Sequence, residues 1–113
     1  MKKDFISWFD FEKMDMRSGT ILEAHEFPEA KKPAYILKID FGPLGNRMSS
    51  AQITDRYTAP ELIGKQIIAV INFPPKQIGP FMSECLVLGV VPDDGRVSLL
   101  HPDHPVANGL RVR

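Results

Sequence analysis

The sequence is poor in cysteine and has no excess of either charge. Its 113 residues include one cysteine, Cys85, and 14 basic side chains against 14 acidic ones. A single cysteine excludes an intramolecular disulfide, and no apolar stretch of signal-peptide length follows the charged start, so we predict a cytoplasmic protein. The balanced charge argues against a strongly basic protein that binds nucleic acids without specificity.

Long hydrophobic runs are missing too. The longest apolar stretches, 67–71 and 85–91, are far shorter than the ~20 residues that cross a bilayer, so we predict no membrane span. A chain this short builds one small domain around a single core. Apolar residues make up 43% of it, which is too large a share for a disordered chain.

Motifs of catalysis are also absent from the sequence. No Gly-x-Ser-x-Gly elbow surrounds Ser49 and Ser50, and neither a Walker loop nor a strand-linked G-x-G-x-x-G loop occurs. His101 and His104 have a spacing that can hold zinc, but two prolines and a polar turn explain the same residues without a metal. We therefore predict that the protein is not an enzyme and uses no metal and no cofactor.

Aromatic side chains are concentrated in the first 16 residues. A short helix there would place Phe5, Trp8 and Phe9 on one face, because they are spaced i, i+3 and i+4. Such a stripe either packs on the protein's own core or contacts a second copy. We predict that residues 1–16 form a helical dimerisation segment. The residues predicted to lie in the interface of a homodimer are Trp8, Phe9, Leu110 and Val112.

Residues 17–113 show the alternation and turn signals of short strands. Strands are predicted at 19–27, 35–41, 47–53, 66–73, 86–91 and 97–100, with a hairpin turn at 93–95. A short helix is predicted between the third and fourth strands, because Thr58 and Glu61 form a capping-box pattern and Gly64 ends it. This order predicts a mainly β protein, a five-stranded OB-fold barrel, with an SH3-like barrel as the alternative.

The segment 72–84 is predicted to be a shaped surface loop between two buried strands. Its prolines limit the freedom of the chain, and it is rich in polar donors and aromatic side chains. Lys76 is the only basic residue between Lys65 and Arg96, so a phosphate contact in this loop would depend on that one side chain. A solvated lysine is the alternative interpretation.

Three segments carry a resemblance to a known family. Residues 15–21 (DMRSGTI) resemble the opening motif of the tRNA-binding domain family, an OB-fold module found alone or attached to some aminoacyl-tRNA synthetases. Residues 27–35 (FPEAKKPAY) and 72–84 (NFPPKQIGPFMSE) resemble the CsaA-type export chaperones within that family. The similarity covers nearly the whole chain.

The resemblance implies a homodimeric, non-catalytic protein that binds tRNA through one face of the barrel and its loops. For the CsaA-type branch it also implies an alternative, a chaperone that binds unfolded or export-bound polypeptides through apolar side chains. RNA binding should weaken steeply with salt, whereas apolar peptide binding should tolerate it. Carried over by position, the RNA-binding residues are Ser50, Gln52, Asn72, Lys76 and Ser83, to which we add Arg47 for its charge. The candidate peptide-binding residues are Phe73, Ile78, Phe81 and Met82.

Overall fold

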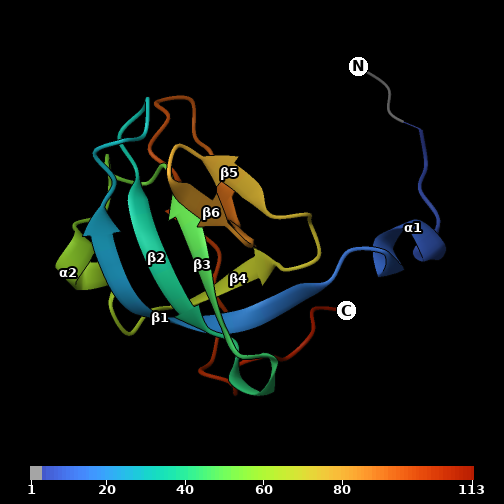
Figure 1. Cartoon of the computed structure of the whole chain (residues 1–113). Helices are drawn as coiled ribbons and strands as arrows, with labels where there is room; N and C mark the ends of the chain where they lie inside the picture. Colours follow the sequence, from blue (N-terminus) through green and yellow to red (C-terminus); the bar gives the residue numbers. More distant parts are fainter. Residues whose placement is uncertain (1–3) are drawn as a thin grey trace.

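Short strands dominate the protein, and helices are few. The computed structural model describes residues 4–113 (Figure 1). The predicted mainly β fold is confirmed. The elements are α1 (Trp8–Glu12), β1 (Met16–Glu26), β2 (Tyr35–Asp40), the 3-10 turn η1 (Gly42–Leu44), β3 (Asn46–Ala51), α2 (Ala59–Leu62), β4 (Gln66–Val70), β5 (Lys76–Ile78), β6 (Phe81–Ser83), β7 (Leu86–Val87), β8 (Gly89–Val90) and β9 (Ser98–Leu99).

Five antiparallel strands form a nearly closed barrel in the order β3-β2-β1-β4-β7. β1 serves two neighbours, because its first half pairs with β4 and its second half with β2. The barrel approaches closure where β3 meets the chain before β7. There the Glu84 N–H donates to the Met48 C=O at 2.8 Å, and the Ser49 hydroxyl donates to the Cys85 C=O at 2.9 Å. This is the predicted OB-fold barrel, with α2 between its third and fourth strands.

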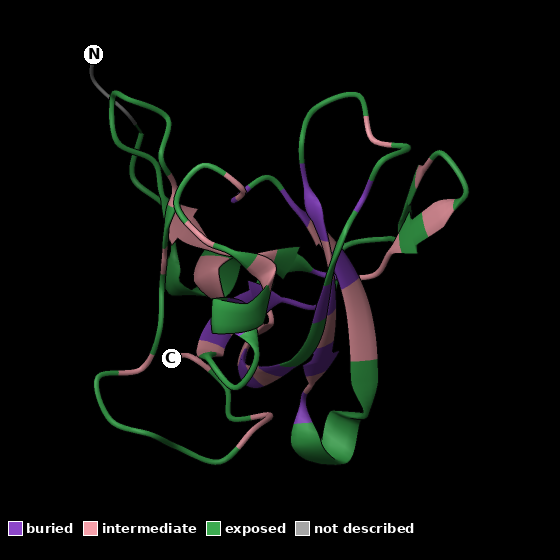
Figure 2. Ribbon diagram, turned by 90° about the vertical axis from the view of Figure 1, so that its left-hand side faces the viewer, coloured by how far each residue is buried: buried purple, intermediate pink, exposed green. Residues whose placement is uncertain are grey.

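The core lies inside the barrel and follows directly from the alternation along the strands. In β2, Tyr35, Leu37 and Ile39 are buried, whereas the residues between them are half-exposed. Leu62 of α2 is fully buried and closes one end of the barrel. Each large aliphatic side chain buried in this way contributes about 1.5–3 kcal/mol to folding. Buried residues therefore gather on the barrel strands, while the connecting loops are exposed (Figure 2).

The predicted helix is present and consists of a single turn. Its capping interaction is the one expected, because the Thr58 N–H donates to the Glu61 carboxylate at 3.1 Å. This hydrogen bond is the main reason that the pKa of Glu61 lies below its ordinary value.

Segment 72–84 differs from the prediction of a loop. It contains a two-stranded hairpin, β5–β6, whose pairs run from Lys76 with Ser83 to Ile78 with Phe81. Gly79 adopts a φ of 57°, which allows the tight turn between these strands. The prolines lie outside the paired residues, so they do not remove any ladder hydrogen bond.

Among residues 4–113, no helix has both the length and the apolar character that a membrane-spanning helix needs.

Candidate functional site

A groove of about 770 Å³ lies along the seam of the barrel between β3 and β7. It begins beyond the Ser49–Cys85 hydrogen bond, which is the closing contact of the seam. Residues 50–53 form one wall and residues 85–89 form the opposite one. The β5–β6 hairpin and the chain that leads into it form the lip. The groove therefore exists because β3 and β7 meet at one end of the seam and leave a hollow at the other.

The walls of the groove are mainly apolar, with a few polar groups. Ile78, Leu86 and Leu99 contribute aliphatic surface, and the exposed ring of Phe73 stands at the lip. Among the described residues that line the groove, Lys76 is the only one with a charged side chain. Such a site can hold an extended or planar apolar group and offer one anion contact beside it.

The hydroxyl of Ser83 attaches the hairpin to the barrel. It accepts a hydrogen bond from the Ser50 N–H at 3.2 Å and lies 3.4 Å from the Cys85 C=O, to which it donates. The Ser83 side chain therefore meets the backbone of Ser50 on β3 at one corner of the groove, and this contact helps to fix β6 against β3.

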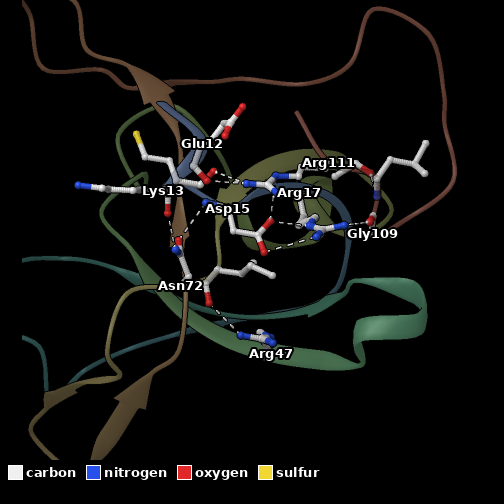
Figure 3. A network of polar contacts seen from close by, with 12 residues as sticks. Glu12, Lys13, Asp15, Arg17, Arg47, Asn72, Gly109 and Arg111 are labelled. Atoms are coloured by element: carbon white, nitrogen blue, oxygen red, sulfur yellow. Dashed lines mark hydrogen bonds and ion pairs between the residues drawn. The ribbon is translucent and has the colours of Figure 1, made fainter. Parts of the chain in front are cut away.

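Four of the six predicted RNA-binding residues lie together in this groove, and two lie apart from it. Ser50, Gln52, Lys76 and Ser83 line the walls. Arg47 instead donates from Nη1 to the Ile71 C=O at 3.0 Å, and the Asn72 amide hydrogen-bonds to the backbone of residues 13 and 15 (Figure 3). Their role in RNA binding stays a prediction.

The predicted peptide-binding residues also divide into two groups. Phe73, which is 52% exposed, and Ile78 line the groove. Phe81 packs edge-on against Phe27, with ring centroids 5.4 Å apart, and so holds the hairpin to the β1–β2 loop. Met82 is half-exposed on β6 and does not line the groove.

The wall of the groove formed by residues 85–89, together with the neighbouring Leu99, was not predicted from the sequence. Leu86, Val87 and Leu99 were assigned to strands, but nothing in their order showed which side chains face a ligand rather than the core. The stretch breaks into the short strands β7, β8 and β9, and this break leaves part of its apolar surface uncovered. Exposed apolar residues next to a hairpin turn are the only signal that could have located this wall.

A second hollow, of about 330 Å³, lies between α1 and the C-terminal segment. Trp8 and Val112 line it, so two of the four predicted interface residues lie beside each other. Phe9 follows Trp8 and Leu110 lies two residues before Val112, and these two residues are 68% and 51% exposed. No residue of α1 is buried, and Trp8 is 83% exposed. The interpretation that this aromatic segment packs on the protein's own core is therefore wrong for Trp8 and Phe9.

The histidine pair does not gather further ligands. Within residues 4–113, no group of three or more His, Cys, Asp or Glu side chains lies close enough to hold a metal ion. His101 Nδ1 lies 2.8 Å from the Pro102 C=O, and His104 pairs with Asp103 at 3.3 Å.

A nearly closed five-stranded barrel with a groove on its seam defines an OB-fold binding domain. The chain belongs to the family described as "Putative tRNA binding domain", whose model matches residues 16–111. It is similar to the crystal structure of the chaperone CsaA from Bacillus anthracis, with a TM-score of 0.93 and 51% identity over 97% of this chain and 100% of that one. It is also similar to the CsaA chaperone protein from Picrophilus torridus, with a TM-score of 0.90 and 54% identity over 96% of this chain and 100% of that one.

Longer proteins contain a similar sequence. The methionine–tRNA ligase of Nanoarchaeum equitans is 39% identical over 111 residues, which are 96% of this chain and 14% of that enzyme. That of Flavobacterium johnsoniae is 34% identical over 98% of this chain and 15% of the enzyme. The chain thus spans about one seventh of the length of these curated relatives.

We predict that Cys85 on the groove wall is chemically inert in the folded protein. Burial raises the pKa of its thiol to about 11, so very little reactive thiolate exists near pH 8. Alkylation by iodoacetamide at pH 8 should be roughly 100-fold slower than for free cysteine, as the thiolate fraction dictates. Unfolding in urea should restore the ordinary rate, and fast alkylation without urea would contradict the buried position.

Proposed function

We propose that the protein is a non-catalytic module that binds tRNA in the groove and works in the cytoplasm as a homodimer. The observation that carries this proposal is the convergence of Lys76, Ser50, Gln52 and Ser83 on one groove, in a chain that belongs to a tRNA-binding domain family. These residues come from segments far apart in the sequence, and the barrel seam brings them together.

The groove offers the three kinds of contact that single-stranded RNA uses. The exposed ring of Phe73 is a platform on which a base can stack, an interaction that contributes about 1–3 kcal/mol. Gln52 and Ser50 can hydrogen-bond to base edges or to a ribose 2′-hydroxyl, whereas the Ser83 hydroxyl, which already donates to the Cys85 C=O, can only accept a further bond. Lys76 can contact a phosphate. With one cation among the described residues that line the groove and no net charge on the chain, binding depends on shape and is weakened by salt.

A homodimer would present two such grooves to one structured RNA. Two weak contacts on one ligand gain affinity through effective concentration, without a basic surface. The exposed aromatic residues of α1 and the hollow beside Val112 support this arrangement, because an exposed apolar patch of this kind is typical of a contact surface.

No catalytic step is part of the proposal. Among the described residues that line the groove, the titratable side chains are Lys76 and Cys85, and the pKa of the Cys85 thiol is raised. A nucleophile needs an activating base within hydrogen-bond reach.

A chaperone function is the second candidate, because most of the groove wall is apolar and two similar structures are chaperones named CsaA. In this alternative an extended segment of an unfolded or export-bound polypeptide lies in the groove, where Phe73 and Ile78 contact its apolar side chains. Lys76 then contributes little.

Replacing Lys76 with alanine tests RNA binding. We expect the affinity for bulk tRNA at low salt to fall roughly fivefold and the slope of log affinity against log salt to decrease by about one, because one phosphate contact is lost. The measurement is fluorescence anisotropy of labelled tRNA between low and physiological salt. Lys65→Ala is the matched control, since Lys65 is exposed before β4 and does not line the groove. Equal loss in both variants would contradict a specific role of Lys76.

Polypeptide binding predicts a different pattern. A labelled unfolded polypeptide should bind with little dependence on salt and on Lys76→Ala, and its affinity should fall roughly tenfold in Phe73→Ala, which removes apolar contact area. Phe5→Ala is the control, because Phe5 is fully exposed in the N-terminal segment and does not line the groove. A polypeptide that binds equally well to all four proteins would exclude the groove as its site.

The homodimer is tested by Trp8→Glu. A charge at the first residue of α1, which is exposed, should weaken self-association at least tenfold, because a charge buried in an interface is costly. Sedimentation equilibrium at micromolar concentration measures this effect. Ile63→Glu is the control, since Ile63 is 55% exposed at the end of α2, away from α1. A wild-type protein that is monomeric at these concentrations would refute the dimer.

A further inference from the structure

Asn72 is the first residue of segment 72–84, and its side chain points toward the N-terminal segment. Its Oδ1 accepts a hydrogen bond from the Asp15 N–H at 3.0 Å, and its Nδ2 donates to the Lys13 C=O at 2.7 Å. These partners define the orientation of the amide, because the N–H can only donate and the C=O can only accept. Asn72 therefore holds the chain that links α1 to β1.

The backbone beside Asn72 strengthens this attachment. The Ile71 N–H donates to the Asp15 C=O at 2.9 Å, so three hydrogen bonds join residues 13–15 to residues 71–72. Arg47 from β3 donates to the Ile71 C=O at 3.0 Å and fixes the same point from the other side (Figure 3). The end of β4 is thus held between the N-terminal segment and β3.

The C-terminal segment is attached to the same point through Asp15. The Asp15 carboxylate accepts from Arg17 Nε at 2.6 Å, and Arg17 Nη1 donates to the Gly109 C=O at 3.0 Å. Arg111 Nη2 donates to the C=O of Glu12, the last residue of α1, at 2.7 Å (Figure 3). A continuous set of hydrogen bonds therefore joins both α1 and the C-terminal segment, which carry the exposed apolar residues near the two chain ends, to Asn72.

The groove begins directly after Asn72. Phe73, Pro74 and Lys76 line the lip, and both residues between Phe73 and Lys76 are prolines. Because proline fixes φ, the two prolines leave the backbone between Asn72 and Lys76 fewer ways to absorb a shift that begins at Asn72. We propose that Asn72 is a positioning residue that couples α1 and the C-terminal segment to the groove. A contact made at α1 then changes affinity in the groove, and a ligand in the groove changes α1.

The first test needs no ligand and compares two similar substitutions. Asn72→Asp keeps the acceptor for the Asp15 N–H but sets an oxygen against the Lys13 C=O. Gln66→Glu is the matched control, because the Gln66 amide makes the same two kinds of bond to Val106, at 2.6 and 3.0 Å, and does not line the groove. Hydrogen exchange of the full chain should be roughly tenfold faster at Asp15 and in β5 for Asn72→Asp only. Exchange in β5 within twofold of wild type in that variant would overturn the coupling.

The second test uses Trp8, the single tryptophan of the chain, which lies on α1. Labelled bulk tRNA is titrated while its anisotropy and the Trp8 emission are recorded. In the wild type and in Gln66→Glu, both signals should change with one midpoint. In Asn72→Asp, tRNA should still bind, several-fold more weakly, without a change at Trp8. A Trp8 response that persists in Asn72→Asp, or that is missing in a wild type that binds tRNA, would overturn the proposal.

The proposed coupling depends on the proposed function in one respect, which is that tRNA is the ligand used in the second test. If wild-type protein fails to bind tRNA, the proposed function falls, whereas hydrogen exchange in the unliganded variants still decides whether Asn72 connects α1 to the lip of the groove.

Discussion

The close approach of β1 to its neighbours at Gly19 is the constraint on which the barrel depends. β1 pairs with β4 from Met16 to Thr20 and with β2 from Thr20 to Glu26, and its register with β2 shifts between Ile21 and Glu23. A Cβ atom at Gly19 would lie 2.7 Å from Cγ2 of Ile39 and 2.8 Å from the Phe41 ring, closer than carbon atoms approach. The missing side chain lets one strand serve two partners, so the sheet curls until β3 faces β7. The groove is the part of that seam which stays open.

Much of this fold could be predicted from the sequence, because its strands alternate and its turns carry their own signals. β2 alternates strictly between buried and half-exposed residues, and Thr58 with Glu61 marked the helix. The β5–β6 hairpin was missed because the prolines around it suggested a loop, although each of them lies outside the paired residues. The breaks between β7, β8 and β9 depend on their partners in space, which no local pattern records.

The site was less predictable because its residues are defined by distant contacts. Ser50 and Lys76 meet on one groove only after the seam forms. Asn72 shows the limit most clearly, since its amide binds backbone groups 57 and 59 positions away. The sequence alone does not distinguish an asparagine that binds RNA from one that holds two segments of the chain together, because the same amide groups serve both roles. The resemblance to the family identifies Asn72 as a candidate residue, and the fold shows which groups its amide contacts.

The two candidate ligands would use the same surface and therefore compete. Phe73 at the lip would serve either as a stacking platform or as an apolar contact, so both ligands would occupy the same end of one groove. Binding of RNA must then reduce binding of polypeptide by mass action, and the reverse holds equally. Since Lys76 is the sole cation among the described residues that line the groove, salt would weaken an RNA complex and leave an apolar one nearly unchanged. Ionic strength would thus shift the groove from one ligand to the other without any change of shape.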